Sequence, residues 1–243
     1  MKPDFNRVSI FIPCIVDRMY PEVGDGVVRV LDRLNIAITI PPDQTCCGQP
    51  AYNAGYSRAA EKAARHFIRL FKSAEVIVCP SGSCVHMIRH GYPQLFKVET
   101  DLWRQAVEIA KKTYEFSEFL VDVIRTEDVQ AEYEGRLTYH ASCHLNFGLG
   151  IDHQPRRLIR NIRKAEFIDM TDADRCCGFG GLFSVKYPEI STSILDEKIE
   201  QVLATGADTL VGCDMGCLLN IQGRLNRRSI DIKVRHLAQV LAG

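Results

Sequence analysis

The chain has 243 residues, 46% hydrophobic and 25% charged, which is ordinary for a folded protein. Lys plus Arg and Asp plus Glu both number 30, so no charge excess points to nucleic acid or an anionic membrane as a main partner. No apolar run approaches the roughly 18 to 20 residues needed to cross a bilayer, and none after Met1 resembles a signal peptide. We therefore expect a cytoplasmic protein with no direct membrane insertion.

Short apolar runs alternate with amphipathic stretches through the first half of the chain. Apolar runs bounded by proline, glycine or polar residues predict buried strands, and apolar residues that recur every three or four positions predict helices. In chain order we predict strand 8–12, helix 22–34, strand 36–40, helix 57–71, strand 76–78 and a helix from Cys84.

The second half repeats this order after a helical stretch at 116–125 and a polar segment at 126–135. Its predicted elements are strand 136–140, helix 155–162, strand 166–168, helix 190–203, strand 209–211 and a helix with Cys217. Strands that alternate with helices form parallel sheets. We therefore predict an α/β fold of two pseudo-repeated Rossmann-like lobes with parallel sheets, residues 1–127 and 128–243.

The cysteines follow the same order in both halves. A single cysteine precedes a Cys-Cys-Gly triplet, and a further cysteine follows it. Thirty-one residues separate Cys14 from its pair, and 32 separate Cys143 from its pair. This repeat indicates a duplicated site with four thiolate ligands in each half. The eight candidate ligands are Cys14, Cys46, Cys47, Cys84, Cys143, Cys176, Cys177 and Cys217.

Each of these cysteine groups follows a predicted strand. Sites in open α/β sheets form at the carboxyl ends of the strands. The predicted fold and the predicted sites therefore agree, although they are drawn from different residues.

The cysteine pattern favours iron–sulfur clusters over disulfides and zinc. Disulfides are rare in a reducing cytoplasm, and adjacent cysteines rarely bridge each other. Structural zinc sites usually pair ligands two to four residues apart. Here three loops spread over 70 residues, from Cys14 to Cys84, which suits a larger cluster. A zinc-bound structural protein remains an alternative.

Six segments resemble the cysteine-rich, Cys-Cys-Gly domain family, which includes the cysteine-rich subunits of heterodisulfide reductase and of anaerobic glycerol-3-phosphate dehydrogenase. Within this family the chain is most similar to the iron–sulfur oxidoreductase subunits of lactate utilization. The segments are Phe11-Ile12-Pro13-Cys14, Cys46-Cys47-Gly48-Gln49-Pro50, Pro80-Ser81-Gly82-Ser83-Cys84, Tyr139-His140-Ala141-Ser142-Cys143-His144, Cys176-Cys177-Gly178-Phe179-Gly180-Gly181 and Asp214-Met215-Gly216-Cys217-Leu218.

The resemblance implies electron transfer through iron–sulfur clusters during oxidation of L-lactate to pyruvate. It also implies a cytoplasmic complex with two partner subunits. We expect one or two clusters in the chain, of the 4Fe–4S type. The sequence shows no flavin or nicotinamide motif, so a relay role is expected. A thiol–disulfide oxidoreductase subunit like that of heterodisulfide reductase is the other alternative.

The chain departs from the family pattern, which ends each half in Cys-x-x-Cys. Ser81 and Asp214 occupy the first of those positions. The cysteine-rich subunit of heterodisulfide reductase uses five cysteines of a half to hold a split cluster, and each half of this chain has four of the five. Cys79 and Cys213 could substitute after a loop shift, but buried cysteines at strand ends are the favoured interpretation. A four-thiolate cubane is the other form of cluster.

Two histidines flank Cys143. His144 lies in the site loop and is a candidate ligand or hydrogen-bond donor to a cluster. His140 faces the sheet, and we expect a structural histidine with satisfied hydrogen bonds.

A basic run lies in the helix after Cys143. We expect a solvated face, with docking of an acidic partner subunit as the alternative. The run comprises Arg156, Arg157, Arg160, Arg163 and Lys164.

Overall fold

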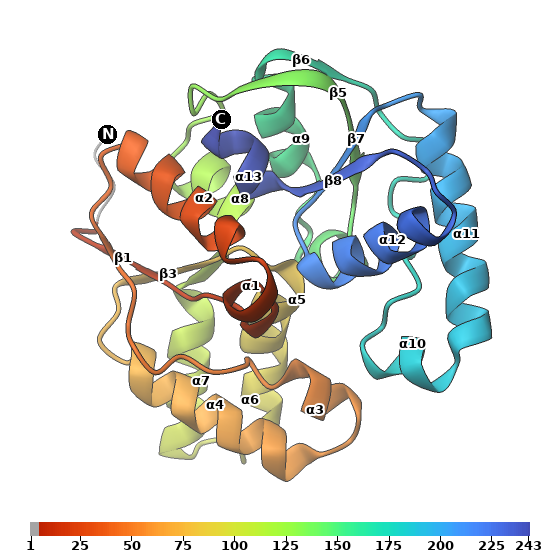
Figure 1. The fold of residues 1–243 in the computed structure, drawn as a ribbon. Helices are drawn as coiled ribbons and strands as arrows, with labels where there is room; N and C mark the ends of the chain where they lie inside the picture. The colour runs from red at the N-terminus through yellow and green to blue at the C-terminus, as the bar shows by residue number, and fades with distance from the viewer. Residues whose placement is uncertain (1–4) are drawn as a thin grey trace. The chain divides into compact units, whose positions relative to one another are not determined.

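The computed structural model describes residues 5–243, which form two compact units divided between Arg125 and Thr126 (Figure 1). Each unit is built on a sheet of four parallel strands, in the order β2-β1-β3-β4 in the first and β6-β5-β7-β8 in the second. The prediction of two Rossmann-like α/β lobes with parallel sheets is thereby confirmed. In residues 5–243, no helix is both long and apolar enough to span a membrane.

The first unit alternates strands with helices. Its strands are β1 (Val8–Ile10), β2 (Ile38–Thr39), β3 (Val76–Cys79) and β4 (Thr113–Glu115). Its helices are α1 (Cys14–Met19), α2 (Pro21–Arg33), α3 (Gln49–Asn53), α4 (Ser57–Phe71), α5 (Gly82–His86), α6 (Tyr92–Leu95), α7 (Asp101–Lys111) and α8 (Phe116–Glu118). Two π-helical turns, Met87–Gly91 and Phe119–Val123, continue α5 and α8.

Apolar helix faces form the core of the first unit. In Figure 1, α2 lies on one side of β1 and β3, and α4 and α7 lie on the other. Helix α4 buries an apolar stripe that includes Phe67 and Phe71, because apolar residues recur every three or four positions along it. Phe11, directly after β1, packs edge-on against Phe67 at 4.9 Å between ring centroids. This aromatic cluster fills the space between the sheet and α4.

The second unit repeats the plan with a longer first strand. Its strands are β5 (Glu132–His140), β6 (Arg163–Phe167), β7 (Thr209–Gly212) and β8 (Lys233–His236). Its helices are α9 (His153–Arg160), α10 (Leu182–Lys186), α11 (Pro188–Ala204), α12 (Met215–Arg227) and α13 (Leu237–Ala242). A π-helical turn, His144–Gly148, follows Cys143.

A half-buried ion pair holds β4 at the edge of the first sheet. The guanidinium of Arg89 donates to both carboxylate oxygens of Glu118, at 3.0 and 2.7 Å. Its Nε donates to the carbonyl oxygen of Thr113 in β4 at 2.8 Å. Since the two charged side chains are only 19% and 15% exposed, the loss of one leaves the other poorly solvated.

We expect Arg89→Met to lower the free energy of unfolding by about 2 to 3 kcal/mol, because it leaves the Glu118 carboxylate half-buried and without its bidentate partner. Arg104→Met is the matched control, because the pair of Arg104 with Asp101 is exposed and contributes less than about 1 kcal/mol. Denaturant titration of the two variants measures the difference. Equal losses would show that Arg89 does not anchor β4.

Candidate metal centres

The four cysteines of the first half meet where the strands end. Cys14 begins α1 after β1, Cys46 and Cys47 lie in the loop before α3, and Cys84 lies in α5 after β3. The thiol of Cys46 contacts those of Cys14 and Cys47, and the thiol of Cys47 contacts that of Cys84. These four residues, the N-terminal cysteine site, form one continuous group of sulfur atoms.

Contact among the thiols separates their acidities. Hydrogen bonds from the thiols of Cys14 and Cys47 lower the pKa of Cys46 to about 3. The same contact with Cys46 raises the pKa of Cys14, and it raises the pKa of Cys47 together with contact to Cys84 and burial. Cys46 is therefore the first thiolate of the group, and a metal ion would stabilise the others as thiolates.

The four cysteines of the second half also meet. The thiol of Cys177 contacts those of Cys176 and Cys217. Cys143 interacts electrostatically with Cys176, and burial is the main cause that raises its pKa. In both units the second cysteine of the pair and the cysteine of the following helix are buried, whereas the other two are partly or fully exposed. We call these four residues the C-terminal cysteine site.

The glycine of each triplet turns the chain so that its amide faces the first cysteine of the pair. Gly48 has φ +87° and Gly178 has φ +75°, in the left-handed region that glycine adopts without strain. The amide of Gly48 donates to Sγ of Cys46 at 3.4 Å, and that of Gly178 donates to Sγ of Cys176 at 3.3 Å. Amide donors to sulfur of this kind stabilise thiolates and tune the potential of a cluster.

A side chain from a later helix holds each Cys-Cys-Gly loop in place. Tyr92 donates its hydroxyl proton to the carbonyl oxygen of Cys47 at 2.9 Å, and Asn220 donates from Nδ2 to that of Cys177 at 2.9 Å. Sequence reasoning missed both residues. The internal repeat does not mark them, because Tyr92 and Asn220 follow the last cysteine of their sites at different spacings.

Ser81 and Asp214 are helix N-caps. The hydroxyl oxygen of Ser81 accepts from the amide of Cys84 at 3.3 Å at the start of α5. A carboxylate oxygen of Asp214 accepts from the amide of Gly216 at 3.2 Å at the start of α12. Both side chains thus satisfy amides at the start of the helix that carries the last cysteine of each site.

The three additional candidate ligands, Cys79, Cys213 and His144, differ in their contacts. Cys79, buried at the end of β3, donates its thiol proton to the carbonyl oxygen of Ser81 at 3.9 Å. Cys213, buried after β7, accepts from the hydroxyl of Tyr139 at 3.9 Å. His144 lies beside Cys143, with 3.8 Å between Nδ1 and Sγ.

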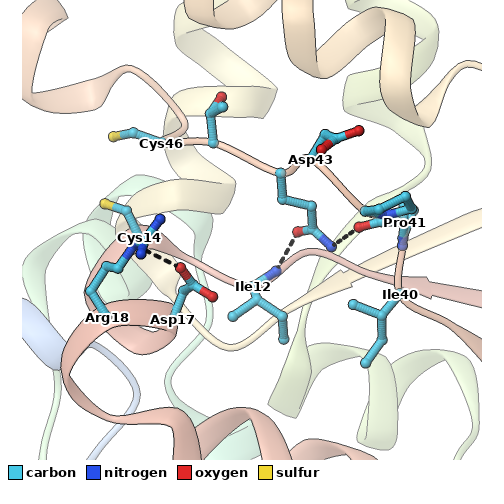
Figure 2. A pocket seen from close by; sticks show the side chains of 11 residues that line it. Ile12, Cys14, Asp17, Arg18, Ile40, Pro41, Asp43 and Cys46 are labelled. Carbon is cyan, nitrogen blue, oxygen red and sulfur yellow. Dashed lines mark hydrogen bonds and ion pairs between the residues drawn. The ribbon is translucent and has the colours of Figure 1, made fainter.

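A pocket of about 530 Å³ reaches the outer thiols of the N-terminal cysteine site. Figure 2 shows the sulfur atoms of Cys14 and Cys46 together beside it. Gln44 shapes the pocket wall: its Oε1 accepts from the amide of Ile12 at 2.8 Å, and its Nε2 donates to the carbonyl oxygens of Ile10 and Pro41, each at 3.0 Å. The outer sulfur atoms of this site are therefore open to small molecules.

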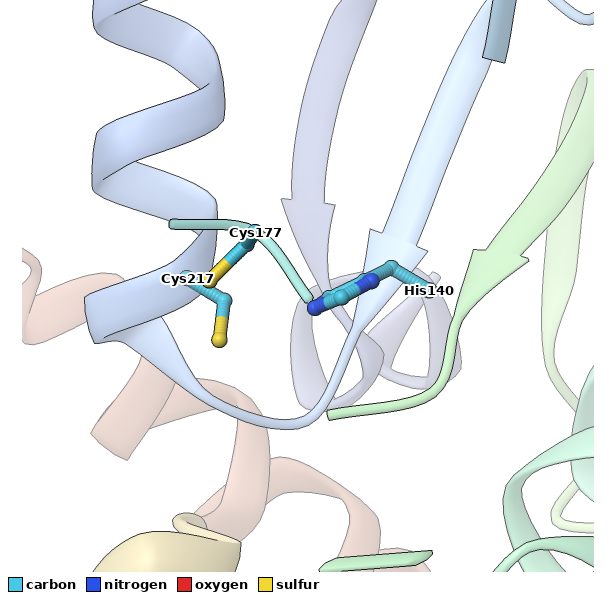
Figure 3. A group of neighbouring side chains, drawn as sticks. All are labelled: His140, Cys177 and Cys217. Atoms are coloured by element: carbon cyan, nitrogen blue, oxygen red, sulfur yellow. The ribbon is translucent and has the colours of Figure 1, made fainter. Parts of the chain in front are cut away.

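His140 does not fit the expectation of a satisfied structural histidine. It is 1% exposed, and neither ring nitrogen forms a hydrogen bond of normal geometry within residues 5–243. A ligand atom of His140 and the sulfur atoms of Cys177 and Cys217 all lie within 4.8 Å of one another, and the ring points toward the two sulfur atoms (Figure 3). Burial, followed by the charge of Lys198, lowers the pKa of His140 to about 3, so the imidazole is neutral.

The basic run after Cys143 is neutralised by carboxylates of the same unit. Each of its five cations lies within 4.0 Å of a carboxylate oxygen. Four of the side chains are 49% to 66% exposed, as expected of a solvated face, whereas that of Arg156 is only 16% exposed. Arg163 and Lys164 lie in β6 rather than in the helix. The acidic residues are Glu127, Asp128, Glu132, Asp152 and Asp169.

Comparison with known proteins assigns the family. A model described as "Cysteine-rich domain" matches residues 8–89 and again residues 137–222. The chain belongs to the cysteine-rich domain family. The two matches cover both cysteine sites, so the internal repeat of the sequence is a repeat of this domain.

Relatives in this family extend the likeness to almost the whole chain. Lactate utilization protein A of Geobacillus sp. (strain WCH70) is 46% identical over 235 residues, which cover 97% of this chain and 98% of that protein. Lactate utilization protein A 1 of Bacillus mycoides (strain KBAB4) is 47% identical over 236 residues, which cover 97% and 96%. The resemblance drawn from the cysteine motifs is thereby confirmed.

A solved structure shares the fold. The crystal structure of a hypothetical protein from Helicobacter pylori aligns with a TM-score of 0.65 at 10% identity. The alignment covers 97% of this chain and 48% of the Helicobacter pylori chain. This chain therefore spans about half the length of the Helicobacter pylori chain.

We expect Gly178→Ala to destabilise the protein more than Gly48→Ala. Both changes force alanine into the left-handed region, which costs about 1 to 2 kcal/mol. A Cβ at position 178 would also clash with the backbone carbonyl oxygen of Ser191, whereas the nearest atom at position 48 is Ala63 Cβ at 3.1 Å. Thermal unfolding of the two variants measures the difference.

Gly223→Ala is the control for this comparison. Gly223 lies within α12 with open space around it, so alanine there stabilises the helix by roughly 0.5 to 1 kcal/mol. An equal loss of stability from the substitutions at positions 48 and 178 would contradict the close approach of Gly178 to Ser191.

Proposed function

We propose that this protein acts in lactate utilization as an iron–sulfur electron-transfer subunit of a cytoplasmic complex that oxidises L-lactate to pyruvate. The convergence of four cysteine thiols in each unit is the observation that carries the proposal. The names of the relatives, 46% to 47% identical over almost the full chain, support the pathway.

The cysteine residues fit an iron–sulfur cluster in number, chemistry and surroundings. Thiolates are soft ligands, and four of them hold a 4Fe–4S cluster. In the N-terminal cysteine site, Cys47 and Cys84 would hold the buried side, and Cys14 and Cys46 the side that faces the pocket. In the C-terminal cysteine site, Cys177 and Cys217 would hold the buried side, and Cys143 and Cys176 the exposed side.

A cluster in these positions accepts and releases single electrons, whereas the oxidation of lactate removes two electrons. We therefore propose that a partner subunit holds the organic cofactor and that this chain relays electrons from it, in a complex with two partner subunits. The partly or fully exposed cysteines of each site would place the cluster near the surface, where electrons can pass to a partner.

Anaerobically purified protein is expected to be brown and to contain iron together with acid-labile sulfide. Cys47→Ser should remove about half of the iron, because it removes the buried sulfur that contacts both Cys46 and Cys84. Cys79→Ser is the matched control and should retain the iron, because the Cys79 thiol is bonded to a backbone carbonyl at the end of β3.

Stoichiometric zinc without iron after anaerobic reconstitution would contradict the cluster and favour the zinc-bound structural protein. Equal losses of iron in the two variants would contradict the assignment of four ligands per site. Cys177→Ser and Cys213→Ser provide the same comparison in the second unit.

The purified chain alone is expected to show no lactate-dependent reduction of an artificial electron acceptor, because the first two-electron acceptor resides on a partner. Addition of the two partner subunits should restore the activity, and a chain stripped of its iron should not. A steady-state assay with L-lactate measures this. Rapid oxidation of lactate by the isolated chain would make it the catalytic subunit instead of a relay.

A further inference from the structure

The two cysteine sites are built on equivalent backbone positions but have different interiors. His140 lies three residues before Cys143, and Phe11 lies three residues before Cys14, each at the end of the first strand of its sheet. Phe11 is fully buried and packs against Phe67 and Phe71. An aromatic hydrocarbon in one unit is thus replaced by an imidazole in the other.

The helix residue that packs beside Phe11 in the first unit is also replaced by a polar residue in the second. A Cβ on Gly48 would meet Ala60, and one on Gly178 would meet Ser191, so these two helix residues correspond. Seven residues further along, Phe67 in α4 therefore corresponds to Lys198 in α11. The packed pair Phe11–Phe67 of the first unit becomes the polar pair His140–Lys198 of the second.

Lys198 has a structural role that explains its burial. It is fully buried, and its Nζ donates to the carbonyl oxygens of Asp172 and Ala173, at 3.0 and 3.2 Å. These bonds fasten the loop that leads to Cys176. Hydrogen bonding to backbone thus accounts for the lysine, but no comparable bonding accounts for His140 within the described residues.

A buried imidazole without hydrogen bonds is costly unless it has another partner. The burial of an unpaired polar group costs on the order of 1 to 3 kcal/mol, and phenylalanine at the equivalent position avoids that cost. The carbonyl oxygen of Ala173 interacts with the ring, although not with normal hydrogen-bond geometry. Histidines that bind metals usually direct one nitrogen at the metal and the other at such a carbonyl.

We propose that His140 is a metal ligand of the C-terminal cysteine site and binds iron through a ring nitrogen beside Cys177 and Cys217. The inference rests on the proposed function, because it concerns the same metal centre. It makes the two sites chemically distinct: thiolates alone in the first unit, thiolates plus one imidazole in the second.

Nitrogen hyperfine coupling tests the proposal. The full chain with Cys46→Ser and Cys47→Ser is reconstituted anaerobically with iron and sulfide, so that signals come from the C-terminal cysteine site, and is then reduced. Pulsed electron paramagnetic resonance should detect the strong coupling of a directly bound nitrogen. The coupling should change from the pattern of ¹⁴N to that of ¹⁵N when the protein is grown with ¹⁵N-histidine.

Two variants identify the histidine. His140→Phe copies the residue of the first unit and should lose the strong coupling, and it should release iron to a chelator at least about tenfold faster. His144→Phe is the control and should retain both properties, although His144 lies beside Cys143. Coupling that is lost in His144→Phe and retained in His140→Phe would overturn the proposal.

If His140→Phe does not fold, the labelled parent protein alone still tests whether a nitrogen binds the iron. A parent sample with full iron and sulfide but weak or absent nitrogen coupling would overturn the ligand assignment and leave the proposed function intact. A parent sample that takes up no iron would overturn the proposed function, and this inference with it. Iron and sulfide assays on the same sample separate the two outcomes.

Discussion

In each unit, four cysteine sulfur atoms lie close together, and the surrounding structure has to stabilise that arrangement. Thiolates in contact repel one another, and burial adds the cost of charge in an apolar setting. The hydrogen-bond contact with Cys46, together with burial and repulsion, raises the pKa values of Cys14 and Cys47. The surrounding chain offsets this cost in both units with an amide directed at the first sulfur of the pair, from Gly48 and from Gly178. Strand ends, the two triplet glycines and the helix caps surround these sulfurs in both units.

The parallel sheet explains how distant cysteines reach one another. Parallel strands end at the same edge of a sheet, and the loops there hold the cysteines of each unit. Ser81 and Asp214 then orient the helices that carry the last cysteine of each site. The thiols of each site therefore come from three segments of the chain, and the last of these is a capped helix.

Much of the fold was predictable because the apolar residues of the core recur at the spacing of helices or form short runs typical of buried strands. Helix 57–71 is observed with its predicted bounds, since its apolar face is regular and long. Strand β4 was missed because its three residues form no apolar run, although Thr113 and Glu115 are buried. Strand β8 was missed because Lys233 and Arg235 alternate toward solvent between its buried residues. Strand β5 begins at Glu132, four residues before the predicted start, for the same reason.

The site was predictable only as far as its repeat could be read. The spacing of the cysteines indicated two groups of four, and the structure brings each group together. The roles of Tyr92 and Asn220 depend on contacts between helices and loops, which no local pattern encodes. Taken by itself, His140 predicts a structural histidine, because buried histidines usually have hydrogen-bond partners. An alignment of the two halves on their cysteines places it against Phe11 and exposes the difference.

Each unit contains all the cysteines of its own site. The first site can therefore form before the second unit has been synthesised. Domains generally fold as units during synthesis, and the ribosome adds about 5 to 20 residues per second. Residues 126–243 therefore take about 6 to 24 s to be translated after the first unit is complete. During that interval the nascent first unit already presents its complete set of thiols. Under the proposed function, the first cysteine site could therefore receive its metal before the second site has been synthesised.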